Sequence, residues 1–184
     1  MLLCRATIND IPDIVALERL DESQRYVGQW LEDRHGAVLS GADARYYLCT
    51  AEDGSPAAYV ILRGLADSSG SVELKRFVVA APGNGLGRRI LSEVLHIAFE
   101  ELRAHRFFLD VYDDNARARH LYESLGFKYE GTMRQAAQRK GVWHDLCLMS
   151  ILEDEYAARL QSASGSVRQI ASNSSPRKKA CVAK

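Results

Sequence analysis

The sequence predicts a single α/β (α+β) domain with a mixed, mostly antiparallel sheet of six or seven strands and helices on both faces. Three apolar, β-leaning runs follow one another between residues 45 and 80, separated only by short turn segments. A long amphipathic helix pattern comes next, and another apolar run follows it. Because a helix separates these two runs, their strands are expected to be parallel and joined by a right-handed crossover.

The first elements expected are a short strand and two helices. Residues 2–7 are mostly apolar and predict the strand. Asp10 and Pro12 supply the N-cap and first-turn chemistry of a helix of about ten residues. A second helix is expected over residues 27–39, where Gly41 follows as a stop signal.

Three consecutive strands are expected in the middle of the chain, over residues 45–51, 57–65 and 71–80. The segments between them, 52–56 and 67–70, are rich in Asp, Ser and Gly, which is the composition of tight turns. These three runs therefore predict an antiparallel meander.

The second half of the chain alternates helix and strand before a closing pair of strands. Apolar residues recur at helical spacing from Leu86 to Leu102, and Gly126 has the position of a residue that ends a later helix. The expected elements are a helix over residues 85–104, a strand over 106–112, a helix over 116–125, and strands over 127–133 and 142–152.

The last part of the chain differs in composition from the rest. Residues 161–184 are rich in Ser, Ala and Asn, carry five basic residues and no acid, and show no periodic apolar pattern. Such a segment buries too little apolar surface to offset its ordering entropy. We therefore expect a domain over residues 1–160 and a flexible, Ser-rich basic tail over 161–184, with nucleic-acid binding by the tail disfavoured.

Cysteine usage and hydropathy bear on the setting of the protein. The four cysteines show neither a Cys-x-x-Cys pair nor metal-ligand spacing to the five histidines. No apolar run approaches the ~18 residues of a membrane span. These patterns favour a cytoplasmic protein without metal, disulfide framework or membrane partner.

A glycine loop, Gly83-Asn84-Gly85-Leu86-Gly87-Arg88-Arg89, lies between a predicted strand and the long helix. Amides at a helix N-terminus point outward without partners, so an anion is the natural occupant of such a loop. The spacing fits neither the Gly-x-Gly-x-x-Gly dinucleotide pattern nor the P-loop. By itself the loop could also be a tight turn whose glycines serve packing.

A second motif follows the strand of residues 106–112: Asn115, then Leu121-Tyr122-Glu123, then Leu125-Gly126-Phe127. This motif resembles the second half of the acetyl-CoA pocket of the GNAT (GCN5-related N-acetyltransferase) superfamily. Residues 82–87 resemble its pyrophosphate motif, Arg/Gln-x-x-Gly-x-Gly/Ala, except that Pro82 replaces the first residue. The resemblance covers residues 2–156 and implies a sheet whose central parallel pair is splayed at the cofactor.

The resemblance also implies a reaction and its residues. Acetyl-CoA would donate its acetyl group to a primary amine, with Tyr122 as the general acid for the thiolate and Glu73 as a candidate base. His144 and Asp145 remain alternatives for the base. The implied cofactor-binding residues are Phe77, Val78, Val79, Gly83, Asn84, Gly85, Leu86, Gly87, Arg88, Arg89 and Asn115.

The acceptor amine is less well defined by the sequence. Residues 131–134 and 141–145 are similar to the branch that contains the ribosomal-protein N-terminal acetyltransferases (RimJ/RimL-like). A protein N-terminus or a small amine is therefore expected, and Tyr26, Trp30, Glu32, Asp33, Trp143 and Asp145 are aromatic and acidic candidates for reading it. The alternative function left open is a non-catalytic acyl-CoA-binding regulatory module. The oligomeric state is also left open, with a homodimer as the candidate assembly.

Overall fold

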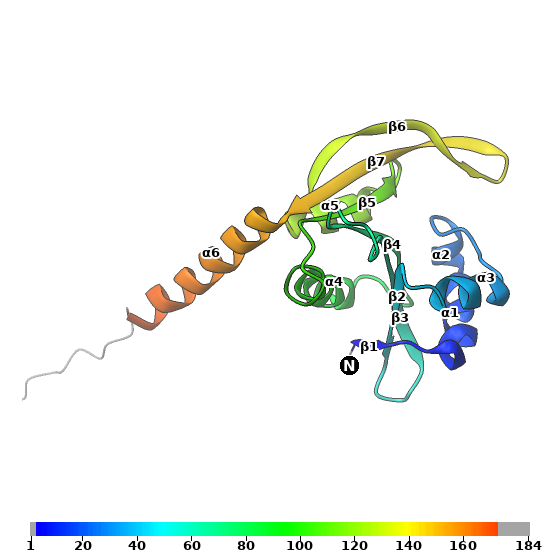
Figure 1. Cartoon of the computed structure of the whole chain (residues 1–184), viewed down its shortest axis with the longest axis horizontal. Coiled ribbons are helices and arrows are strands. Elements are labelled where there is room, and N and C mark those ends of the chain that lie inside the picture. Colours follow the sequence, from blue (N-terminus) through cyan, green and yellow to red (C-terminus); the bar gives the residue numbers. More distant parts are fainter. Residues whose placement is uncertain (1–2, 173–184) are drawn as a thin grey trace, which may run out of the picture.

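In the computed structural model of the chain, residues 3–172 are described, and a seven-stranded sheet in the order β1-β2-β3-β4-β5-β7-β6 forms its centre (Figure 1). Only β4 and β5 are parallel, and every other neighbouring pair is antiparallel. The expected fold class is therefore confirmed. The strands are β1 Leu3–Arg5, β2 Ala44–Thr50, β3 Pro56–Arg63, β4 Ser71–Val79, β5 Arg106–Tyr112, β6 Lys128–Arg139 and β7 Val142–Leu152.

Helices cover both faces of the sheet (Figure 1). One face packs against α4 and forms the larger apolar core, and the other packs against α1 and α3 around Tyr46 and Tyr59. The helices are η1 Ile8–Asp10, α1 Ile11–Glu18, α2 Asp21–Gln24, α3 Glu32–Leu39, α4 Leu86–His96, the π-turn η2 Ile97–Glu101, α5 Ala116–Ser124 and α6 Glu153–Ser172.

The parallel pair β4–β5 is short, and this shortness opens the sheet. Pairing extends only from Ser71↔Arg106 to Glu73↔Phe108, after which the two strands separate. At the same level, the pairing of β4 with β3 shifts by one residue, so that Lys75 is an extra residue between Leu74 and Arg76. A bulge of this kind bends a strand and re-aims its side chains. The point where the parallel pair separates thus coincides with a local irregularity in β4.

Residues 25–31 are not helical, so the prediction of a helix from residue 27 was wrong over its first part. The main-chain N–H of Trp30 donates to the Glu18 carboxylate at 2.9 Å, where a helix would need it for a main-chain bond. Helix α3 begins only at Glu32. A tertiary hydrogen bond between residues 12 positions apart therefore takes the place of the helical main-chain bond that the local pattern predicted.

The C-terminal part of the described chain is helical beyond the expected domain boundary. Helix α6 runs to Ser172 and projects away from the body of the protein (Figure 1). Tyr156 anchors its first turns by stacking on Phe99, with ring centroids 4.7 Å apart. The division into a domain over 1–160 and a flexible tail stays a prediction, and residues 173–184 lie outside the described part.

Candidate active site

A cleft of about 650 Å³ opens where β4 and β5 separate. Its walls come from β4, the glycine loop, the end of β5, α5, the loop after α2 and the closing hairpin. The lining residues include Tyr26, Gly28, Lys75, Arg76, Phe77, Val78, Val79, Pro82, Gly83, Gly85, Gly87, Arg88, Asp110, Asn115 and Tyr122. Segments that are far apart in the sequence therefore meet at one place.

The glycine loop lies at one end of this cleft and leads into α4. Gly83 and Gly85 adopt φ values of +102° and +80°, which favour glycine, and Gly85 is the N-cap residue of α4. The Asn84 Oδ1 atom accepts the Leu86 N–H at 3.0 Å, which leaves the following amides of the first turn without a side-chain cap. The loop therefore presents free amides at the positive end of a helix dipole.

Four of the seven cofactor-binding residues expected in this loop line the cleft, and three do not. Gly83, Gly85, Gly87 and Arg88 line the cleft, and the Arg88 guanidinium donates to the Ser124 hydroxyl at 2.7 Å. The other three, Asn84, Leu86 and Arg89, are not among the lining residues; Asn84 caps an amide, and Leu86 is buried in the core.

Phe77, Val78 and Val79 line the cleft on the strand edge that β5 leaves free. Their neighbours on the other side, Val60, Tyr59 and Ala58, pair with them in regular antiparallel register. Because β4 is paired on one side only at this level, its open main-chain groups can receive an extended ligand as an added strand.

Asn115 and Tyr122 face the same cleft from α5. Asn115 caps the helix, since its Oδ1 accepts the Ala118 N–H at 3.2 Å. Tyr122 is 8% exposed, and its ring packs against Phe127 with centroids 5.7 Å apart. Burial raises the pKa of the Tyr122 hydroxyl above its ordinary value, and the Asp110 carboxylate raises it further. The phenol is therefore held in its protonated form.

The expected base, Glu73, is not among the residues that line the cleft. Glu73 is the last residue of β4 that pairs with β5, and its carboxylate accepts a hydrogen bond from the Lys75 ammonium at 3.0 Å. Asp110 lines the cleft instead, two residues beyond Phe108, the last residue of β5 that pairs with β4. Desolvation raises the pKa of Asp110, and the Lys75 ammonium offsets part of that rise. Sequence reasoning missed Asp110, although a lone acid in the run Phe107-Phe108-Leu109-Asp110-Val111 was a usable signal.

The expected acceptor side of the cleft is lined by Ser23, Tyr26, Val27 and Gly28, and the hairpin of β6 and β7 contributes Ala137 and Leu146 to the same cleft. Arg139 of the hairpin joins the two walls, because it donates to the Arg25 carbonyl and to the Asp114 carboxylate, both at 2.8 Å.

The six side chains expected to read the acceptor therefore have different surroundings. Tyr26 lines the cleft, and Trp30 is buried behind it. Trp143 is 57% exposed, and Asp145 accepts the Gln135 N–H at 2.8 Å. Glu32 and Asp33 lie exposed in the first turn of α3.

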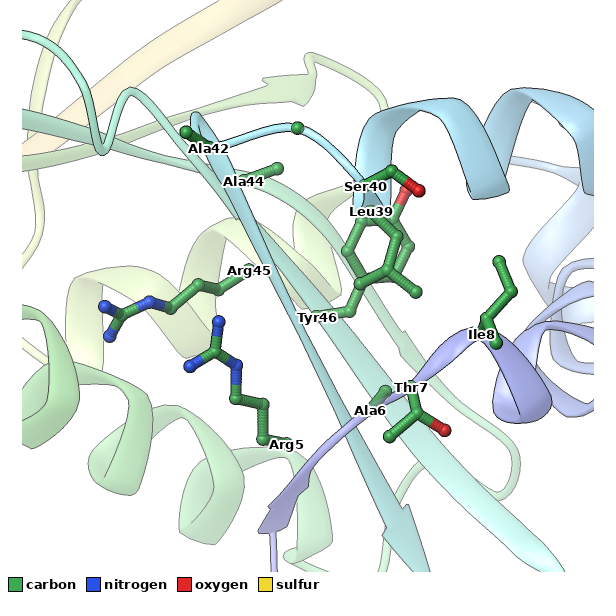
Figure 2. Close-up of a pocket in the computed structure, with 11 residues that line it drawn as sticks. Arg5, Ala6, Thr7, Ile8, Leu39, Ser40, Ala42, Ala44, Arg45 and Tyr46 are labelled. Carbon is green, nitrogen blue, oxygen red and sulfur yellow. The ribbon is translucent and has the colours of Figure 1, made fainter.

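A second hollow, of about 320 Å³, lies where the chain leaves β1 (Figure 2). The side chains of Arg5 and Arg45 extend to one side of β2, and Tyr46 and Ser40 lie on the other. The Ser40 hydroxyl donates to the Gly36 carbonyl at 2.8 Å. Charged and hydroxyl groups thus lie on opposite sides of a strand, and this hollow does not gather reactive groups as the cleft does.

The sheet order, the splayed parallel pair and the glycine loop at the start of α4 define the class of proteins built on the N-acetyltransferase fold. A model of the acetyltransferase (GNAT) family matches residues 11–127. The chain belongs to this family.

Individual relatives agree with the family. A spermidine N(1)-acetyltransferase of Vibrio cholerae is 33% identical over 85 residues, or 45% of this chain and 49% of the relative, so the match spans about half of that protein. A putative ribosomal N-acetyltransferase of Bacillus subtilis is 28% identical over 124 residues, or 67% of this chain and 66% of the relative. A solved spermidine/spermine N-acetyltransferase structure from Vibrio cholerae shares the fold, with a TM-score of 0.75 at 23% identity, covering 86% of this chain and 96% of that one. Over the described residues, none of the helices is both long and apolar enough to cross a membrane.

Proposed function

We propose that the chain transfers the acetyl group of acetyl-CoA to a primary amine of a small polyamine such as spermidine. The observation that carries the proposal is the cleft itself, in which free helix amides, an open strand edge, Tyr122 and Asp110 face one space. Family membership supports acetyl-CoA as the donor.

The donor would lie along the splay. Its diphosphate would bind the amides around Gly85, Gly87 and Arg88, where the helix dipole favours an anion. Its pantetheine arm would pair with the open edge of Phe77–Val79 as an added strand, which would bring the thioester to the Val78 N–H. Pro82 has no N–H, and in this arrangement none is needed from it.

The acid would come from α5 and the base from β5. Tyr122 would donate its proton to the departing thiolate, and Asp110 would take a proton from the ammonium of the acceptor, directly or through water. The amine then attacks the thioester carbonyl, the carbon–sulfur bond breaks, and the amide and coenzyme A leave. Asp110 takes the role expected of Glu73 because Asp110 lines the cleft and Glu73 does not.

Two arguments favour a polyamine as the acceptor. The curated relative with 33% identity is a spermidine N(1)-acetyltransferase. The cleft also places the Asp110 carboxylate beyond the last paired residues, where it can attract a cationic amine. A peptide N-terminus is the second candidate, because a putative ribosomal N-acetyltransferase is also among the relatives.

The test is acetyl-CoA turnover against spermidine, spermine, free amino acids, aminoglycosides and peptides that represent protein N-termini. We expect kcat/KM for spermidine or spermine to exceed that for every peptide. A preference for peptides would move the chain to the ribosomal-protein branch. Acetyl-CoA binding without turnover of any amine would support the non-catalytic alternative.

Asp110→Asn is expected to lower kcat/KM for the preferred amine by about 100-fold, because the amide can neither attract nor deprotonate an ammonium group. Acetyl-CoA affinity, measured by calorimetry, is expected to change by less than about twofold. Glu73→Gln is the matched comparison, since it neutralises the nearest carboxylate of β4. A large loss in Glu73→Gln with little in Asp110→Asn would return the base to Glu73.

A further inference from the structure

A buried polar cluster lies directly behind the acceptor side of the cleft. Glu18, the last residue of α1, is 1% exposed and receives several donors. Its Oε1 atom accepts from the Tyr59 hydroxyl at 2.6 Å and from the Arg76 guanidinium at 2.5 Å. Its Oε2 atom accepts the Trp30 N–H at 2.9 Å. Four segments far apart in sequence are therefore joined at one carboxylate.

This cluster keeps its charges although it is buried. Desolvation by itself would raise the pKa of Glu18, but His35, the Tyr59 and Trp30 hydrogen bonds and the Arg76 charge together lower it. The carboxylate is thus ionised opposite the Arg76 guanidinium, whose side chain is 8% exposed. Removing one partner of such a pair leaves the other charge buried without compensation, which is strongly destabilising.

Arg76 links this cluster to the cleft. It lies on β4 immediately before Phe77, and the bulge at Lys75 places it on the sheet face that carries Glu18. Its Nη1 atom also donates to the carbonyl of Gly28, a residue of the expected acceptor side of the cleft. One nitrogen therefore bridges the buried carboxylate and the main chain of the loop.

The same guanidinium also holds Trp30. Its centre lies 4.0 Å from the centroid of the Trp30 ring, and Arg34 lies at 4.2 Å from that centroid. A planar guanidinium can stack on a ring and donate in its own plane at the same time, which a lysine ammonium cannot do. The geometry at Arg76 is therefore specific to arginine.

We infer that Arg76 is a positioning residue that fixes the acceptor wall, residues 25–31, to the strand that holds the acetyl donor. This inference rests on the proposed function for its substrate and on the contacts above for its mechanism. The loop has little regular structure of its own between α2 and α3, and its front is tied by Arg139 at the surface. Arg76 and Glu18 hold its back, so the distance between acceptor and thioester depends on them.

Arg76→Lys is expected to raise the KM for the preferred amine at least about tenfold and to change the KM for acetyl-CoA by less than about twofold. Arg34→Lys is the matched control, because it makes the same change over the same ring without a bond to Glu18 or Gly28. We expect Arg34→Lys to leave both constants near the wild-type values.

A substrate-free readout separates this inference from the proposed function. The chain has two tryptophans, and in a Trp143→Phe background the emission reports Trp30 alone. Arg76→Lys is expected to shift this emission to the red and to increase its quenching by acrylamide, with Arg34→Lys changing it far less. Unchanged quenching in Arg76→Lys overturns the inference, as does an equal rise in both KM values.

If the wild-type chain turns over no amine, the proposed function fails, whereas the quenching comparison still decides whether Arg76 anchors the loop. If Arg76→Lys does not fold, Glu18→Gln keeps the size of the side chain and weakens the same anchor. It is expected to show the same quenching change in smaller measure, and wild-type quenching in a folded Glu18→Gln would count against the inference.

Discussion

Replacement of Tyr122 by phenylalanine is expected to lower kcat for acetyl transfer by about 100-fold or more, because the departing thiolate loses its proton donor. Tyr122 lines the cleft and its ring packs on Phe127, so the substitution removes one oxygen atom and keeps the packing. Burial raises the pKa of this hydroxyl, which keeps the proton in place until the thiolate forms. Acetyl-CoA affinity is expected to stay within about twofold of the wild-type value.

Turnover in Tyr122→Phe is best followed by the loss of thioester absorbance, because Cys4 is exposed and would react with a thiol reagent. Tyr129→Phe is the matched control, since that ring is 54% exposed and its hydroxyl bonds to Thr132 of the same strand. Wild-type kcat in Tyr122→Phe would remove this tyrosine from the mechanism. An equal loss in Tyr129→Phe would indicate a general effect on the fold.

The features from which a donor site was predicted are local in the sequence. The glycine loop and the helix after it are contiguous in sequence, and the apolar spacing from Leu86 onward sets which face of α4 is buried. Asn115 and Tyr122 are related by helical spacing within α5. Because these features depend on neighbours in the chain, their order alone allowed the cofactor residues to be proposed.

The acceptor side depends on contacts between distant segments, and it could not be predicted in the same way. Glu18 and Arg76 are separated by 58 positions, and the same Glu18 carboxylate accepts the Trp30 N–H from the non-helical segment 25–31. The position of Asp110 depends on where the parallel pairing ends, and that point coincides with a bulge at Lys75. A one-residue shift in β4 cannot be read from a run that is β-leaning throughout.

The extent of helix α6 also depends on tertiary contacts that the local sequence does not reveal. Residues 161–172 lack a periodic apolar pattern, yet the helix continues through them from a start that is fixed by packing. Tyr156 against Phe99 and the Arg159 bond to the Ser124 carbonyl hold that start. Propensity can extend a helix whose first turns are anchored, and composition alone does not reveal the anchor.

Gly87→Glu is expected to raise the dissociation constant for acetyl-CoA by about 100-fold or more, equivalent to about 2.7 kcal/mol. A Cβ atom at Gly87 would lie 3.5 Å from Leu121 and 3.7 Å from Phe77 and Val79, which are ordinary contacts. A methyl group therefore fits, but a longer side chain must extend into the cleft. The glutamate carboxylate would then compete with the diphosphate for the first-turn amides of α4.

Gly87→Ala is the control for this prediction, because its backbone φ is not in the left-handed region and its Cβ meets no close contact. Calorimetric titration with coenzyme A should give wild-type affinity in Gly87→Ala and little heat in Gly87→Glu. Equal affinity in the two variants would place the diphosphate away from the glycine loop. Since Gly87→Glu leaves Asp110 and the acceptor wall untouched, its defect should also disappear at saturating acetyl-CoA, with kcat for the amine restored, whereas the defect of Tyr122→Phe should persist.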